Sequence, residues 1–149
     1  MPEPTRPPRV LIADDNPQGA ELLEAYLSDS GYDLRSAADG EETLRAVAEW
    51  QPDLILLDIM MPRLSGFEVC KRLRANPATR DLAVLMITAL DQVSDVERAV
   101  EAGTDDFLSK PINKTALLLR VRSLLRSRQY KRELDRALAY IEAVDRGGG

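Results

Sequence analysis

Histidine is absent from this 149-residue sequence, and cysteine occurs once, at Cys70. The lack of histidine excludes Ser-His-Asp and Cys-His catalysis, histidine-ligated zinc and phosphohistidine chemistry within the chain. A single cysteine cannot form an internal disulfide, which is typical of proteins of a reducing cytoplasm. Any chemistry must therefore depend on carboxylates, hydroxyls, lysine and the backbone.

Long hydrophobic runs are also lacking. The apolar stretches are much shorter than the roughly 20 residues that a membrane-spanning helix needs. The first eight residues, MPEPTRPP, have no apolar segment of the kind found in secretory signals, and their four prolines predict a disordered lead over residues 1–8. Hydrophobic residues make up 44% of the chain and charged residues 30%, as in globular proteins. We therefore expect a cytoplasmic globular protein without a membrane partner.

Charge is distributed unevenly along the chain. Residues 1–111 contain 11 Lys/Arg and 21 Asp/Glu, whereas residues 112–149 contain 9 Lys/Arg and 4 Asp/Glu. This change of sign predicts a globular domain followed by an extension of different character. We place the domain over residues 9–125 and a helical extension over residues 126–149, which ends in a flexible Gly-Gly-Gly.

Strand-like and helix-like segments alternate along the domain. The expected strands are RVLIA (9–13), YDLRSA (32–37), LILLD (54–58), AVLMIT (83–88) and DFLSKP (106–111). Amphipathic segments with helical spacing separate them, and one long helix is expected from about residue 113 to 145. Such alternation predicts an α/β fold: a doubly wound, flavodoxin-like parallel sheet with strand order 2-1-3-4-5.

Complementary polar residues stand at the carboxyl ends of four of these strands. Asp14 and Asp15 follow the first strand, Asp58 ends the third, Thr88 ends the fourth and Lys110 follows the fifth. Each alone is typical of a turn, a helix cap or a solvated charge. Because the ends of parallel strands meet at one edge, where ligands bind in this fold class, their coincidence predicts a functional site.

The chemistry of this site follows from its charges. Three neighbouring carboxylates repel one another, and a Mg²⁺ ion with its preference for oxygen ligands would relieve the repulsion. A metal, a hydroxyl and a lysine together suit phosphoryl transfer, which needs positioning and charge stabilisation. Asp58, at the end of the most apolar strand, is the predicted nucleophile, with Asp14 and Asp15 as metal ligands.

The motifs LIADDN, LLDIMMPRLSGFEV, ITA and SKP, in this order, resemble those of two-component response regulator receiver domains, over about residues 9–125. The resemblance implies that Asp58 accepts a phosphoryl group from a histidine kinase or a histidine phosphotransfer protein. It implies Mg²⁺ ligation by Asp15, by Asp14 through water and by the carbonyl of Met60. It also implies phosphoryl contacts from Thr88 and Lys110, and a phospho-acceptor regulator rather than an enzyme acting on other substrates.

The same resemblance assigns two further roles. Thr88 would couple to an aromatic switch residue on the fifth strand, which is Phe107 here and lacks the hydroxyl of the more usual tyrosine. Side chains two positions after the nucleophile and after the threonine control the lifetime of the phosphoryl group. Here these are Met60 and Leu90, both apolar, and since neither can orient a water we predict dephosphorylation over hours.

The extension contains a heptad-like stripe. Its positions step by four and three residues, through Tyr130, Leu134, Ala137, Ile141 and Val144. A parallel homodimer through this stripe is the first interpretation. A second is that the chain is the receiver part of a larger regulator, because the helix resembles those that precede diguanylate cyclase domains. Nucleic-acid binding is disfavoured by the interspersed acids, and the helix folding back on the acidic domain is a further alternative.

A competing enzyme class is the haloacid-dehalogenase-type phosphatases, which also use Asp, Thr and Lys on an α/β sheet. These enzymes place the nucleophile after the first strand, with a second Asp two residues later, and they add a cap domain. Here Asp14 and Asp15 are adjacent and no cap is evident, so the pattern disfavours this class.

Overall fold

The computed structural model describes residues 6–89 and 93–148. Five strands form one parallel sheet in the order β2-β1-β3-β4-β5, as the sequence predicts. The strands are β1 (Arg9–Ala13), β2 (Asp33–Ala37), β3 (Leu54–Asp58), β4 (Ala83–Thr88) and β5 (Asp106–Ser109). The helices are α1 (Pro17–Leu27), α2 (Gly40–Trp50), α3 (Gly66–Ala75), α4 (Val93–Ala102) and α5 (Lys114–Gly148).

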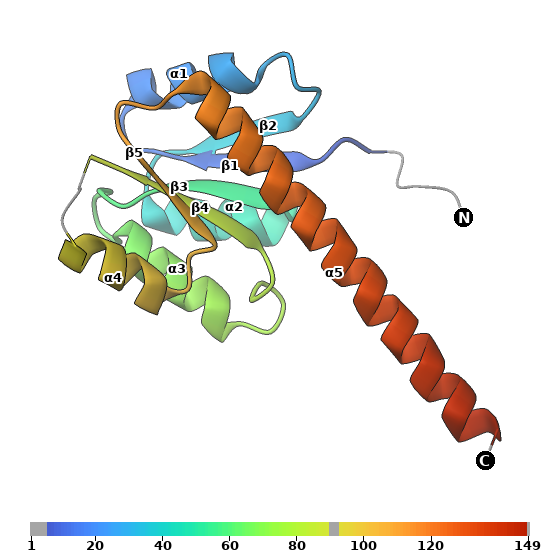
Figure 1. Cartoon of the computed structure of the whole chain (residues 1–149). Coiled ribbons are helices and arrows are strands. Elements are labelled where there is room, and N and C mark those ends of the chain that lie inside the picture. Colours follow the sequence, from blue (N-terminus) through green and yellow to red (C-terminus); the bar gives the residue numbers. More distant parts are fainter. Residues whose placement is uncertain (1–5, 90–92, 149) are drawn as a thin grey trace.

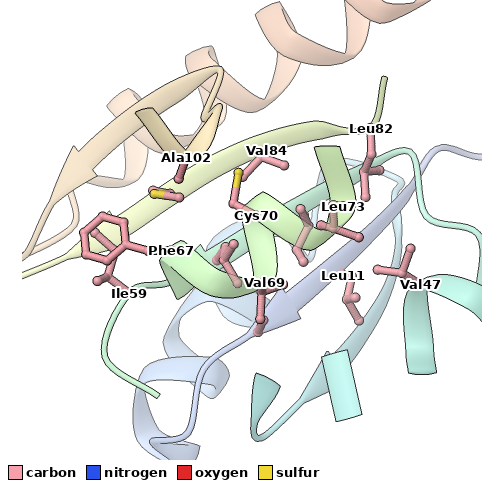
Figure 2. Packing of buried hydrophobic residues seen from close by; sticks show 14 of the residues in the cluster. Leu11, Val47, Ile59, Phe67, Val69, Cys70, Leu73, Leu82, Val84 and Ala102 are labelled. Atoms are coloured by element: carbon pink, nitrogen blue, oxygen red, sulfur yellow. The ribbon is translucent and has the colours of Figure 1, made fainter. Parts of the chain in front are cut away.

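Helices cover both faces of the sheet, with α1 and α5 on one face and α2, α3 and α4 on the other (Figure 1). Alternate residues of β3 therefore enter two different cores: Ile55 and Leu57 contact the α2–α4 side, whereas Leu54 and Leu56 contact the α1–α5 side. Figure 2 shows the first of these cores, in which α3 places Val69 against the sheet. Burial on both faces explains why β3 and β4 are apolar up to their last residues, Asp58 and Thr88.

Local sequence signals explain where the helices begin. Asn16, Asp39 and Ser65 occupy N-cap positions, and each side chain accepts a hydrogen bond from a backbone N–H of the first turn. α3 must also begin with glycine, because a Cβ on Gly66 would lie 2.5 Å from the carbonyl oxygen of Asp58. This close approach positions the start of α3 directly beside the end of β3.

The first part of α5 packs on the sheet, and the second part projects from the domain (Figure 1). Leu117 and Val121 are fully buried, whereas Leu134 and Ile141 are 58% and 53% exposed. None of the helices in the described part of the chain is long and apolar enough to cross a membrane.

An ionic junction holds α5 to the domain. The junction lies at the amino ends of the strands, opposite the carboxyl ends that carry the candidate site. Arg128 donates hydrogen bonds to the carbonyls of Pro52 and Asp53, and the Asp53 carboxylate also accepts from Arg6 at 2.9 Å. Arg132 approaches the same carboxylate at 3.8 Å. Contacts with the domain thus continue about one turn or two past residue 125, where the sequence suggests that the extension begins.

Candidate functional site

Three carboxylates meet at the carboxyl ends of β1 and β3. Oxygen atoms of Asp14, Asp15 and Asp58 all lie within 4.8 Å of one another, although the first two are far from the third in sequence. Asp14 and Asp58 are buried, and Asp15 is exposed. The sheet order brings them together because β1 and β3 are hydrogen-bonded neighbours.

Lys110 supplies the facing positive charge. Its Nζ lies 3.0 Å from Oδ2 of Asp58 and 4.0 Å from Oδ2 of Asp14. Burial alone would lower the pKa of the Lys110 ammonium, but the hydrogen bond to Asp58 and the surrounding carboxylates outweigh this effect and raise it. Lys110 is therefore a fixed cation next to the predicted nucleophile.

One carboxylate of the cluster is destabilised in its charged form. Burial raises the pKa of Asp14, and the negative charge of Asp58 adds to this, while the hydrogen bond from the Asn16 N–H acts in the opposite direction. Three carboxylates with a single nearby lysine are a set of hard oxygen donors with excess negative charge. Such a set fits a divalent cation, and Mg²⁺ is a suitable one.

The other predicted site residues lie around this cluster. Thr88 is fully buried at the end of β4, and its carbonyl accepts a hydrogen bond from the Lys110 N–H at 2.7 Å. The Met60 N–H donates to Oδ1 of Asp58 at 2.9 Å, and the Met60 side chain is 60% exposed. The bond between Lys110 and Pro111 is cis.

The predicted switch residue Phe107 is half-buried and packs against the core on the α2–α4 side. Leu90, the second predicted lifetime residue, lies outside the described residues. The extension residues are remote from the acidic cluster and exposed, with Tyr130 at 62% and Val144 at 51%.

Sequence reasoning missed two features. Gly19, in the first turn of α1, leaves room for the site, because a Cβ there would lie 2.4 Å from Oδ2 of Asp14. Only its position five residues after Asp14, on a helix that starts beside the site, could have indicated this. The extension also exposes Leu138 and Tyr140, at 49% and 71%, which widen its apolar stripe beyond the strict heptad positions.

Comparisons with known proteins agree with this geometry. The family model described as response regulator receiver domain matches residues 10–122. The chain is 45% identical over 119 residues to the DNA-binding dual master transcriptional regulator RpaA of Synechocystis, covering 80% of this chain and 49% of that protein. It is 46% identical over 118 residues to response regulator PleD of Caulobacter vibrioides, covering 79% and 26%. The chain thus spans about a quarter to a half of the length of these curated relatives.

Solved structures show the same fold. A response regulator from Chloroflexus aurantiacus superposes with a TM-score of 0.78 at 39% identity, covering 81% of this chain and 99% of the other. The receiver domain of the sensor histidine kinase PA1611 from Pseudomonas aeruginosa, whose structure has a magnesium ion coordinated in the active-site cleft, superposes with a TM-score of 0.75. That domain is 28% identical, and the match covers 80% of this chain and 98% of the other.

Proposed function

The chain belongs to the family of response regulator receiver domains of two-component systems, and on that premise we propose that Asp58 accepts a phosphoryl group from a histidine kinase or a histidine phosphotransfer protein. Since the chain itself contains no histidine, the donor is a different protein or a different segment. The observation that supports this proposal best is the contact of Asp58 with Lys110 inside a cluster of three carboxylates.

Each residue of the site has a role in this transfer. A carboxylate oxygen of Asp58 attacks phosphorus while the bond from phosphorus to the donor nitrogen breaks. The Lys110 ammonium, 3.0 Å from Asp58, is placed to neutralise the developing charge on the phosphoryl oxygens. Mg²⁺, when bound, would add positive charge at the same oxygens, and Asp14, Asp15 and Asp58 are the residues that would hold it, with the Met60 carbonyl as a further ligand.

Thr88 and Phe107 are the proposed relay from the site to the surface. Thr88 lies at the end of β4, and Phe107 lies on the adjacent strand β5 against the core on the α2–α4 side. The region around β4 and β5 would exist in two arrangements, one of them with the Phe107 side chain turned inward. Contact of the Thr88 hydroxyl with a phosphoryl oxygen would favour the arrangement with the inward Phe107. Since Phe107 has no hydroxyl, the relay would depend on packing.

Substitution of the acceptor tests the proposal directly. Asp58→Asn should abolish labelling by a phosphodonor such as acetyl phosphate in the presence of Mg²⁺, because an amide is not a nucleophile of this kind. Asp29→Asn, a change at an exposed carboxylate, is the matched control and should label like the parent. Equal labelling of Asp58→Asn and the parent would refute phosphorylation at this residue.

We propose that α5 carries the output through its exposed stripe, and that a second copy of this chain pairs with it. The alternative is that α5 connects the receiver to a further domain, such as a diguanylate cyclase, consistent with the partial coverage of longer relatives. Light scattering of the phosphorylated or beryllofluoride-bound protein separates these: a doubled mass supports pairing, and an unchanged monomer mass supports a connecting helix.

A further inference from the structure

The exposed stripe of α5 faces away from its own domain. The stripe is made of the heptad positions Tyr130, Leu134, Ala137, Ile141 and Val144, together with Leu138. Its large side chains are 49–62% exposed, and Ala137 is exposed as well. At about 100° per residue, the stripe lies roughly 150° around the helix from Leu117 and Val121, which are fully buried against the sheet. The stripe from Tyr130 to Val144 therefore points away from the receiver that carries it, whereas Ser127 lies beside the domain, in a pocket that Leu82 and Asp105 also line.

Charge is segregated along this helix. Residues 113–132 contain seven Lys/Arg and no Asp/Glu, whereas residues 133–144 contain three Asp/Glu and one Arg. The basic half is the half that packs on the domain, and the acidic half is the part that projects (Figure 1). Two copies side by side in the same direction would place basic halves together, whereas opposite directions would place each acidic half beside a basic half.

The exposed charges beside the stripe also favour antiparallel over parallel pairing. Arg126 and Lys131 flank it at the heptad positions that face each other in a parallel pair, so that pairing would bring two cations together twice. In an antiparallel pair centred between Asp135 and Arg136, Lys131 instead lies near the level of Glu142 of the other copy. Within its own copy, Lys131 also contacts Asp81 at 2.7 Å.

Packing across the stripe also depends on direction. In a parallel pair each residue meets its own copy, so Ala137 would face alanine and Ser127 would face serine. In the antiparallel pair Ala137 faces Leu134, and Ser127 faces Val144, so that each small residue meets a large one. Alternation of large and small residues across an interface fills space more completely.

We propose that α5 pairs with α5 of a second copy in the antiparallel direction. This rests on the pairing proposed above and specifies its geometry, and it replaces the parallel arrangement that the heptad pattern first suggests. The two receivers would then lie at opposite ends of the helix pair. With a rise of about 1.5 Å per residue, their attachment points near Val121 would be separated by about 45 Å along the pair.

Cysteine cross-linking of the full chain tests the direction. Residues 127 and 144 are about 26 Å apart along the helix. A disulfide between position 127 of one copy and position 144 of the other can therefore form only in the antiparallel pair, and one between equal positions only in the parallel pair. Ser127→Cys mixed with Val144→Cys should give a disulfide-linked heterodimer on mild oxidation, and each variant alone should give little covalent dimer. Cys70 is fully buried and provides a silent background.

The experiment distinguishes an error in the direction of pairing from the absence of pairing. Efficient cross-linking of each variant with itself, without the mixed product, would show a parallel pair and overturn the direction only. A monomer mass for the parent by light scattering at all concentrations, with no cross-linked product, would overturn pairing itself while leaving phosphorylation at Asp58 untouched.

The dimer fraction should also fall from low to high salt, because opposite charges on the two antiparallel helices attract and salt screens them. A rise with salt would contradict the proposal.

Discussion

At the scale of single residues, Gly19 shows how a position without a functional group can determine a site. A methyl group at Gly19 would lie 2.4 Å from Oδ2 of Asp14, so the carboxylate would have to move. Gly19→Ala should therefore weaken Mg²⁺ binding by about tenfold, the size of effect seen when groups that position metal ligands are changed. Stability should rise slightly, since alanine is favoured over glycine within a helix.

A lower Mg²⁺ affinity together with a higher stability would indicate displacement of Asp14, whereas general damage to the fold would lower both. Mg²⁺ affinity is measured by calorimetric titration, and stability by thermal unfolding without the metal. Gln18→Ala, in the same turn and exposed, is the control and should leave the affinity unchanged. Unaltered affinity in Gly19→Ala would show that the Asp14 carboxylate does not need this space.

A second prediction at this scale concerns Met60 and the lifetime of the phosphorylated state. Its side chain is 60% exposed beside Asp58 and has no group that can orient an attacking water. Phosphorylated protein should therefore lose its label over hours, and Met60→Asn should shorten the half-life by adding an amide that can hold a water. Decay of radiolabel after removal of the donor measures both. A parent half-life below a minute would contradict this interpretation.

At the scale of elements, the base of α5 depends on one carboxylate. Asp53 accepts hydrogen bonds from the Arg6 side chain at 2.9 Å and the Arg9 N–H at 2.8 Å, and Arg128 and Arg132 lie within 4.0 Å of it. Burial raises the pKa of Asp53, but these donors and cations outweigh burial and lower it. The ionised carboxylate thus stabilises the fold at neutral pH.

Asp53→Asn should reduce the free energy of unfolding at pH 7 by about 2–4 kcal/mol, mainly because Arg128, whose side chain is only 16% exposed, loses its charged partner. A lowered pKa means that this contribution is present above the ordinary value of 3.8 and is lost as pH falls below it. The difference between variant and parent should therefore be constant near neutrality and decrease toward about pH 3. Denaturant titrations over this range measure it, with Asp29→Asn as control. A difference that widens in acid would contradict the assignment.

The elements also show what the sequence could reveal. The strand order was predictable because apolar runs such as residues 54–57 identify central strands and short connections restrict the topology. The convergence of the acidic residues with Lys110 was predictable because four of the five strands end on, or are followed by, a carboxylate, a hydroxyl or a lysine. The junction at Asp53 was not, since it joins residues from three distant segments through side-chain contacts that no local pattern reveals. The role of Gly19 was hidden for the same reason: it depends on the rotamer of another residue.

At the scale of the whole molecule, the proposed metal site predicts a link between stability and Mg²⁺. If Mg²⁺ binds the assembled cluster and not the unfolded chain, the free energy of unfolding should rise with its concentration, by about 2.7 kcal/mol at a hundred times the dissociation constant. Asp15→Asn should be more stable than the parent without metal, because one of three repelling charges is removed. It should gain little from Mg²⁺.

Thermal unfolding of both proteins, with Mg²⁺ and with a chelator, tests this linkage. Ca²⁺-free sodium salt at equal ionic strength is the control for general screening. If metal stabilised the parent and Asp15→Asn equally, the cluster would not be the place where it binds.

The phase of α5 has a consequence for how such a helix can evolve or be engineered. Because the helix is anchored to the domain as far as Arg132, the direction in which the stripe points from Leu134 onward is set by the number of residues between Arg132 and Leu134. Inserting one residue after Arg132 would turn the stripe by about 100°, whereas inserting seven would nearly restore its bearing. Tolerance to changes in length should therefore be periodic, with whole heptads accepted and single residues rejected.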